Sequence, residues 1–199
     1  MISKTVSYKL KIIFDYTLSF FGLIFLFIPL IIILIICSID TKSLGLIAQI
    51  RIGQHGKSFK LYKFKTMVDI DGPKIYVTTA NDPRITKLGR FLRKTKLDEL
   101  PQLLNVLKGE MSLVGPRPDV PGYADRLKGE DRIILQVKPG ITGPSSLAFN
   151  DEEELLAKQA DPKEYNDKVI WPKKIEINKE YIRNYSFKKD IYYLLKTIF

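Results

Sequence analysis

An uncharged apolar run of 18 residues, at positions 20–37, constrains this chain more than any other feature. A domain of about 160 residues would have to give most of its core to such a run, whereas a bilayer takes it directly. The run is too long for the apolar part of a cleavable signal peptide, and no Ala-x-Ala-like site follows it. We therefore expect a membrane-associated unit over residues 1–40 and a separate domain over residues 41–199.

Pro29, near the middle of the run, leaves the path of this helix open. As one straight helix, residues 12–39 would extend roughly 42 Å, enough to cross a bilayer. Proline lacks an N–H and its ring crowds the carbonyl of Phe25, which predicts a kink, but spanning helices also kink. Basic residues flank both ends of the run, which fits a helix that enters and leaves by the cytoplasmic face. These residues favour a spanning and a re-entrant helix equally.

Composition excludes several kinds of active site. The chain has one histidine, His55, and one cysteine, Cys37, which excludes a thiolate zinc cluster, a multi-histidine metal site and a disulfide framework. Catalysis must then use carboxylates, lysine, arginine or a bound cation. We expect His55 to be exposed and Cys37 to face lipid.

The charge balance raises a different class of function. The 32 basic and 22 acidic residues give a net charge of +10, which also suits a membrane-tethered nucleic-acid binder. The charge is spread along the chain, however, and no known DNA- or RNA-binding module is present. We therefore expect no nucleic-acid partner.

Two helices and a strand are predicted in the first half of the second domain. Residues 58–67 (SFKLYKFKTM) alternate apolar and basic side chains, which predicts a strand or extended edge. A helix is predicted over residues 85–92, capped by Asn81 or Asp82. Leucine spacing predicts another helix that begins near Leu97 or Asp98 and ends at Gly109.

Pro101 fixes where that second helix begins, because proline is tolerated in a first turn and costly in an interior. Asp98 and Glu99 then lie in the first turn. Free N–H groups and the positive end of the helix dipole gather there, an arrangement that binds phosphate and keeps a carboxylate ionised. Taken alone, such an acidic pair is more often an ordinary helix cap.

The C-terminal part is less informative. Residues 151–168 are acidic and predict a surface helix with a loop. Residues 175–199 carry aromatic and lysine side chains at helical spacing, which fits a helix at the membrane interface and a helix packed on the core equally.

Four sequence blocks occur in a characteristic order: residues 49–53 (QIRIG), 63–67 (KFKTM), 86–118 (TKLGRFLRKTKLDELPQLLNVLKGEMSLVGPRP) and 139–143 (PGITG). Together they resemble the bacterial sugar transferase family, in the small single-domain form of the monotopic phosphoglycosyl transferases (PglC-like). The third block is long and specific. The resemblance covers about residues 10–145 well, fades up to residue 174 and returns weakly in the tail.

The resemblance implies a mixed α/β, mostly helical fold. A re-entrant membrane helix broken at a proline would precede a small cytoplasmic catalytic domain with interfacial amphipathic helices. It therefore favours the re-entrant alternative, at the cytoplasmic face of the bacterial inner membrane. Family members often carry Ser-Pro at the break, whereas this chain has Ile28-Pro29. The break must then rest on Pro29 and packing, without a side-chain hydroxyl.

The implied reaction transfers a sugar-1-phosphate from a UDP-sugar to undecaprenyl phosphate. Asp98 matches the family's nucleophile, which would form an aspartyl phospho-sugar intermediate and release UMP. Glu99 matches the partner carboxylate, whose role in acceptor positioning, proton handling or metal support stays open. Mg²⁺ is implied as a cofactor, with Asp98 as its carboxylate ligand.

Basic residues that match phosphate-binding positions complete the implied site. Arg93 and Arg117 match family arginines, whose planar forks bind phosphate oxygens in pairs. Lys65 matches a basic position that would lie over the diphosphate. Lys63 is two residues away on the same predicted strand face, so the two lysines are not separated.

Three exposed-looking cations are interpreted differently: Lys87, Arg90 and Lys94 are expected to form a solvated basic face. A catalytically inactive membrane scaffold of the same fold remains an alternative, but its mark would be loss of the acidic pair or of Arg117, and all are present. A homodimer is left open. The donor sugar is not fixed; its selector is expected over residues 144–174, with these candidate contacts: Ser145, Ser146, Asn150 and Trp171.

Overall fold

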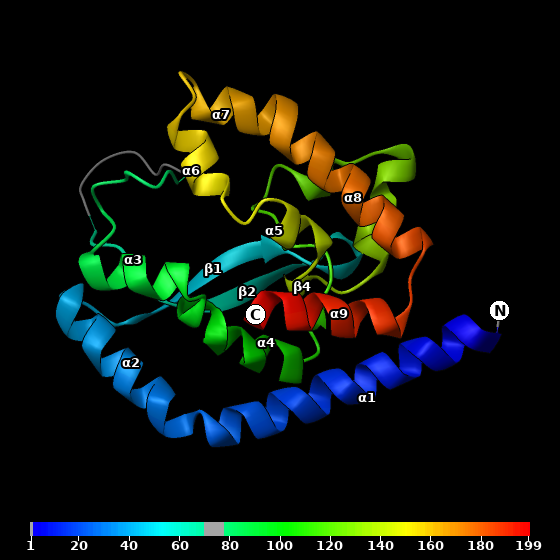
Figure 1. Cartoon of the computed structure of the whole chain (residues 1–199), viewed down its shortest axis with the longest axis horizontal. Coiled ribbons are helices and arrows are strands. Elements are labelled where there is room, and N and C mark those ends of the chain that lie inside the picture. Colours follow the sequence, from blue (N-terminus) through cyan, green and yellow to red (C-terminus); the bar gives the residue numbers. More distant parts are fainter. Residues whose placement is uncertain (1, 70–77) are drawn as a thin grey trace.

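The computed structural model describes residues 2–69 and 78–199. Two N-terminal helices, α1 (Ile2–Phe25) and α2 (Phe27–Asp40), form a bent arm along one side of the molecule (Figure 1). Within the described residues no single helix is long and apolar enough to cross a bilayer, but this pair, bent by 67°, is sufficient in length and composition. The predicted break in the N-terminal helix is therefore present.

The break lies at Leu26, about one turn before Pro29. The ladder is intact on both sides, with the Leu26 N–H donating to Gly22 (2.9 Å) and the Leu30 N–H donating to Leu26 (2.8 Å). Pro29 has no N–H to offer the Phe25 carbonyl, and its ring crowds that oxygen. A proline therefore bends a helix on its N-terminal side, which explains the offset from the proline itself.

Apolar side chains cover the outer faces of both helices, and the most exposed around the bend are Phe25, Phe27 and Ile28. The inner face of α2 packs on the rest of the chain. Cys37 is completely buried there, in a cluster with Phe64 and Leu92. The expectation that Cys37 faces lipid is wrong, because a small side chain allows α2 to approach the domain closely.

Two small sheets lie between the helices. Strands β1 (Leu46–Ile52) and β2 (Ser58–Phe64) form an antiparallel hairpin, and β3 (Ser112–Val114) pairs in parallel with β4 (Gly140–Thr142). A 3₁₀ turn (Gln54–Gly56) connects the hairpin, with His55 exposed at a positive φ of 60°.

Strand β2 is shorter than the predicted strand over residues 58–67. Pairing with β1 stops at Leu46 opposite Phe64. Beyond that point the N–H of Lys65 donates to the carbonyl of Gly45 (2.8 Å), and Met67 forms only an isolated bridge with Ile85. Alternation of side chains alone did not show where the partner strand begins.

Helix α3 (Lys87–Lys94) starts two residues later than predicted. Thr86 caps it by accepting the N–H of Gly89 at 2.8 Å. Neither proposed cap is used: Asp82 instead accepts hydrogen bonds from the backbone and side chain of Arg84. A nearby guanidinium thus competes successfully with the helix N-terminus for this carboxylate.

The second predicted helix begins at Leu97, as expected. Its first part is a 3₁₀ helix (Leu97–Gln102) containing Pro101, and α4 (Leu103–Leu107) continues it. Gly109, at a φ of 77°, ends the segment. Asn105 ties α4 to the hairpin, because its side chain accepts the N–H of Tyr62 and donates to the carbonyl of Lys60.

Most of the remaining elements cover the sheets from the side opposite the bent arm, whereas the last helix lies beside α1 (Figure 1). They comprise 3₁₀ helices Ala124–Arg126 and Gly129–Gln136, α5 (Pro144–Ala148), α6 (Glu152–Ala157), α7 (Pro162–Tyr165), a π-helical segment (Asn166–Ile170), α8 (Trp171–Arg183) and α9 (Phe187–Ile198). In the tail one face is core, with Tyr181 and Asp190 buried, and another is exposed, with Tyr192 and Leu195. One face of the tail therefore packs on the core, as one alternative has it, and contact of the exposed face with a membrane stays a prediction.

A buried ion pair fastens α1 to the other end of the chain. The Lys11 ammonium donates to Asp190 of α9 (2.9 Å) and to the carbonyl of Val114 in β3 (2.8 Å). One turn later, Asp15 accepts from the Ser112 hydroxyl (2.7 Å). The first half of α1 is thus part of the core, and the exposed apolar surface belongs mainly to its second half and to α2.

Candidate active site

The acidic pair Asp98 and Glu99 lies at the start of the 3₁₀ helix that follows α3. Lys96 precedes it in the left-handed conformation, at a φ of 59°, which turns the chain sharply between the two helices. Both carboxylates are buried, with 5% of Asp98 and 7% of Glu99 exposed. Two adjacent buried carboxylates are tolerated only where cations compensate them.

Asp98 keeps one carboxylate oxygen free. Its Oδ1 is buried and has no hydrogen-bond partner in the described part of the chain. The pKa of Asp98 is raised to about 6, first by burial and then by the charge of Glu99. Three cations limit this rise: Lys63, Arg93 and Arg117. At neutral pH the site therefore presents an ionised oxygen that is free to attack or to bind a cation.

Glu99 differs from Asp98 in two ways: neither of its oxygens is free, and its pKa is lowered. Both of its oxygens accept from Arg117, at 2.5 Å from Nη2 and 3.1 Å from Nη1. Burial alone would raise the pKa of Glu99, but the charge and hydrogen bonds of Arg117 outweigh it and lower that pKa to about 2. Glu99 is thus a fixed anion that orients a guanidinium, and such a weak base cannot handle protons near neutral pH.

The structure distinguishes Lys63 from Lys65, which the sequence alone could not. Lys63 lies among the charged residues of the site, and burial together with Arg93 and Arg51 lowers its pKa to about 8 despite the nearby Asp98. Lys65 points elsewhere and donates to Ser43 (2.7 Å) and Asp69 (2.5 Å). The two side chains therefore have different partners, and Lys65 lies just beyond the end of β2 at Phe64.

Arg93 reaches the site from the end of α3. One end of its guanidinium forms an ion pair with Glu153 of α6, and Nη1 lies 3.5 Å from the hydroxyl of Thr66. Its Nε is buried without a partner in the described residues. The structure thus brings Arg93 close to Asp98, as predicted. The Nη2 group of Arg93, however, is already paired with the carboxylate of Glu153.

Arg51 is the site residue that the sequence analysis missed. Burial and the charge of Arg117 lower its pKa to about 10, and its Nε is buried with no partner within the described ranges. The hairpin register pairs Arg51 with Phe59 and Lys63 with Ile47, so Arg51 and Lys63 share one face of the sheet. The sequence would have placed Arg51 beside Lys63 only if the register between the strands of the QIRIG and KFKTM blocks had been known.

The resulting arrangement has one free carboxylate oxygen on Asp98 beside Lys63, Arg93 and Arg117, with Arg51 close to Lys63 and Arg117. Arg51 and Lys63 come from the hairpin, Arg93 from α3, and Arg117 from the proline-bounded turn after β3. Clustered guanidinium and ammonium groups bind phosphate oxygens. A phosphate group bound by these cations would therefore lie close to the ionised carboxylate of Asp98.

The sequence matches the family described as bacterial sugar transferase over residues 6–199. The chain belongs to the bacterial sugar transferase family. It is 36% identical over 189 residues to EpsL, an uncharacterised sugar transferase of Bacillus subtilis (strain 168), covering 95% of this chain and 85% of that protein. It is 37% identical over 184 residues to the UDP-glucose:undecaprenyl-phosphate glucose-1-phosphate transferase of Escherichia coli (strain K12), covering 89% of this chain.

A third relative of this transferase is the undecaprenyl-phosphate galactose phosphotransferase of Salmonella typhimurium, at 37% identity over 163 residues and 74% of this chain. The chain spans only 37% of the length of the Escherichia coli enzyme and 31% of the Salmonella enzyme. It thus matches most of a small relative and one part of the larger ones.

The donor set of the transferase fits a divalent cation that arrives with a substrate. No three His, Cys, Asp or Glu side chains gather as a metal site in residues 2–69 and 78–199. Mg²⁺, however, commonly binds one or two carboxylates and completes its shell with water and substrate phosphates. The free Oδ1 of Asp98 supplies such a ligand.

The candidate sugar-selecting residues are scattered. Ser145 and Ser146, at the start of α5, have buried hydroxyls with no partner among the described residues. Trp171 lies at the start of α8 and directs its indole N–H toward Asp119 at 3.4 Å. Asn150, between α5 and α6, is exposed.

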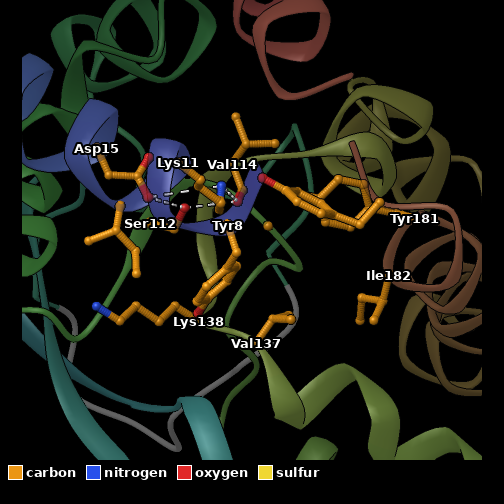
Figure 2. Close-up of a pocket in the computed structure, with 12 residues that line it drawn as sticks. Tyr8, Lys11, Asp15, Ser112, Val114, Val137, Lys138, Tyr181 and Ile182 are labelled. Atoms are coloured by element: carbon orange, nitrogen blue, oxygen red, sulfur yellow. Dashed lines mark hydrogen bonds and ion pairs between the residues drawn. The ribbon is translucent and has the colours of Figure 1, made fainter. Parts of the chain in front are cut away.

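A cavity of about 380 Å³ lies away from the acidic pair, between α1, β3 and α8 (Figure 2). None of the six predicted site residues lines it. Lys11 and Asp15 point into its wall and are paired there, with Val114 and Ser112 among their partners. Its polar groups are spent on holding α1 in place, so it offers no second reaction centre.

Proposed function

We propose that this chain transfers a sugar-1-phosphate from a UDP-sugar to undecaprenyl phosphate through a covalent intermediate on Asp98. The observation that carries the proposal is the free, buried and ionised Oδ1 of Asp98, whose charge interacts with three cations: Lys63, Arg93 and Arg117. The names of the relatives, which specify glucose or galactose and undecaprenyl phosphate, support the substrate classes.

The reaction has two displacements at one phosphorus. First, an Asp98 oxygen attacks the phosphorus that bears the sugar, and the bond from this phosphorus to the bridging diphosphate oxygen breaks, releasing UMP. A phosphate oxygen of the lipid then attacks the same phosphorus, and the bond to Asp98 breaks. The carboxylate is regenerated and the sugar leaves on a lipid diphosphate. Covalent catalysis of this kind lets a water-soluble donor and a lipid acceptor bind in turn.

Each cation has a distinct part in this proposal. Arg117 is held in place by Glu99 and would bind donor phosphate oxygens with the guanidinium nitrogens that face the site. Lys63 and Arg51, on the hairpin face, would offset charge on the leaving UMP. Glu99 acts as a positioning residue for Arg117. Lys65, bound to Ser43 and Asp69, would shape the segment after β2.

Mg²⁺ would be held by Asp98 together with donor phosphate oxygens. When bound, it would neutralise phosphate charge and so lessen the repulsion between the diphosphate and the attacking carboxylate.

The bent helix pair is proposed as a re-entrant anchor at the cytoplasmic face of the bacterial inner membrane. Its 67° bend and its exposed apolar surface support this, and the bend itself carries three exposed apolar side chains: Phe25, Phe27 and Ile28. Placing the bend deepest in the bilayer brings Asp40 back to the surface from which α1 entered. The site would then lie at the interface, within reach of a lipid phosphate.

The test is a single-turnover experiment without lipid acceptor. Enzyme, Mg²⁺ and a panel of UDP-sugars should give a burst of UMP approaching one equivalent for the correct donor, and the protein should gain the mass of one phospho-sugar. Turnover that requires donor and acceptor together, with no burst and no mass gain, would overturn the covalent mechanism. No UMP with any donor, even after undecaprenyl phosphate is added, would favour the inactive scaffold.

A further inference from the structure

The site contains two arginine–carboxylate pairs, and they differ in how firmly the carboxylate is held. Glu99 is enclosed, with 9% of its side chain exposed, and Arg117 binds both of its oxygens. Glu153 lies nearer the surface, with 41% of its side chain exposed, and pairs with Arg93 through Oε1. Water can replace Arg93 around the Glu153 carboxylate at little cost, because an ion pair with an exposed partner is weak. The pair between Arg93 and Glu153 is therefore able to open, whereas the other is fixed.

Glu153 satisfies only half of the guanidinium edge that it faces. The Nε and Nη2 groups of an arginine lie on one edge and together bind two oxygens of a phosphate. In Arg93, Glu153 takes Nη2, while Nε is buried without a partner in the described part of the chain. On the other side, Nη1 makes only long contacts with the hydroxyl of Thr66 (3.5 Å) and with Sδ of Met67 (3.8 Å). A phosphate in the place of Glu153 could bind Nη2 and the unsatisfied Nε together.

Helix α6 keeps the Glu153 carboxylate within reach of Arg93. The preceding residue, Glu152, binds Lys174 of α8 at 2.5 Å. The backbone carbonyl of Glu153 accepts the N–H of Ala80 (3.1 Å). Because the helix is held at both points, only the side chain of Glu153 has to move for its contact with Arg93 to break and form again.

Two observations indicate which phosphate of a donor Arg93 would bind. Its positive charge acts on Asp98, which attacks the sugar-bearing β-phosphorus in the proposed reaction. Its partner Glu153 belongs to residues 144–174, the segment in which the sugar selector is expected. The cations of the hairpin were assigned to the departing UMP in the same scheme. Arg93 therefore lies on the sugar side of the diphosphate.

We propose that Glu153 is an intramolecular competitor of the donor's β-phosphate: it occupies Arg93 while the site is empty, and the sugar-bearing phosphate displaces it. The inference rests on the proposed function and adds to it a residue that governs donor binding and product release. Glu153 weakens the binding of every ligand that brings a phosphate to Arg93. When the sugar phosphate leaves with the lipid, Glu153 binds Arg93 again and so promotes release of the product.

The competition is measured by isothermal titration of the full chain in detergent micelles, with Mg²⁺ and either UDP or UMP. Glu153→Gln removes the competing anion and should lower the dissociation constant of UDP by about fivefold, the factor that corresponds to loss of a partly exposed ion pair. UMP lacks the β-phosphate and should bind both proteins equally. Unchanged or weaker UDP binding in Glu153→Gln would overturn the inference, because a residue that merely positions Arg93 for phosphate would weaken binding when lost.

Two controls separate the contact from the change in net charge. Glu154→Gln removes an exposed carboxylate from the same helix and should leave both dissociation constants within twofold of the parent. In an Arg93→Gln background, Glu153→Gln should no longer tighten UDP binding, because the cation for which the two anions compete is absent. Tightening that persists without Arg93, or that is equal for UMP or in Glu154→Gln, would assign the effect to net charge and overturn the inference.

The UMP burst tests the proposed reaction separately. The donor concentration that gives half of the maximal burst should fall in Glu153→Gln in parallel with the dissociation constant of UDP. A burst from the parent without tighter UDP binding in the variant overturns the competition and leaves the covalent mechanism in place. Tighter UDP binding without a burst from any donor supports the competition and overturns the reaction. Failure of UDP to bind any of these proteins overturns the inference, whatever the burst shows.

Discussion

Arg117 holds both carboxylate oxygens of Glu99, with nitrogen–oxygen distances of 2.5 and 3.1 Å. This fork leaves Glu99 permanently ionised, so the two adjacent acids of the site have different chemistry. Asp98 keeps an unpartnered oxygen and a raised pKa, whereas Glu99 has neither. The site therefore contains one carboxylate with a free oxygen and one whose oxygens are both held by Arg117.

Asp98→Asn should abolish the UMP burst and the mass gain, because the amide lacks the anionic oxygen that attacks. It should also leave the metal-free protein folded and at least as stable at pH 7.5. The folded pKa of about 6 lies above the unfolded value, so ionising Asp98 costs stability increasingly from about pH 4 to pH 6 and fully above that range. Removing this cost stabilises by at most about 3 kcal/mol. Chemical denaturation at pH 4 and pH 7.5 measures the difference, and a burst from the variant would contradict its assignment as nucleophile.

Glu99→Gln and Arg117→Lys should lower kcat/KM for UMP release by similar factors, because each removes one side of the same fork. Loss of a charged hydrogen-bonded pair at this site corresponds to about 1–3 kcal/mol of transition-state stabilisation. Combining the two should cost less than the sum, as expected for residues that act through one contact. Glu154→Gln and Arg126→Lys, both exposed, are the matched controls. Additive losses in the double variant would show that Glu99 acts independently of Arg117.

Lys63 should set the alkaline limit of the reaction. Its pKa is lowered to about 8, so its positive charge is present below that pH and is lost as the pH rises through it. We expect the burst rate to fall above about pH 8 and the fall to move to higher pH in Lys63→Arg, because arginine stays charged. Lys65→Arg is the control, and in this variant the burst rate should fall at the same pH as in the parent. If the pH at which the burst rate falls changed in Lys65→Arg and not in Lys63→Arg, the roles of the two lysines would be reversed.

Pro29→Ala should straighten the helix pair. The substitution restores an N–H to the Phe25 carbonyl and removes the ring that crowds it. Cysteine introduced at Lys9 or Lys42, both exposed, should label only from the cytoplasmic side in the Cys37→Ser parent. Part of the Pro29→Ala population should expose position 42 to the periplasm, while Ile28→Ala, which keeps the proline, should not. Opposite accessibility of positions 9 and 42 in the parent itself is the result that contradicts a re-entrant anchor.

Local chemistry was predictable from the sequence where one residue decides it. Pro101 placed the start of the helix at Leu97, and hence the acidic pair in its first turn, because its backbone constraint needs no tertiary partner. The bend at Leu26 follows from Pro29 for the same reason. Asp82 was the exception, since its guanidinium partner Arg84 competed for the carboxylate.

Features that depend on pairing were not predictable. Arg51 enters the site only because β1 and β2 align in one register, and a shift by one residue would turn it to the other face. Lys63 and Lys65 differ only through their tertiary partners, because Lys65 lies beyond the end of β2 and binds Ser43. Cys37 is buried because α2 packs on Leu92 of a helix that begins about 50 residues later. In each case the deciding partner is distant along the chain.

The ion pair between Lys11 and Asp190 joins residues 179 positions apart. During synthesis on the ribosome, α1 emerges long before α9, so Lys11 must wait for nearly the whole polypeptide before Asp190 reaches it. Until then the first helix carries charges that keep its N-terminal half out of hydrocarbon. The last helix thus completes the attachment of the first, so the two ends of the chain are locked together only when synthesis is nearly finished.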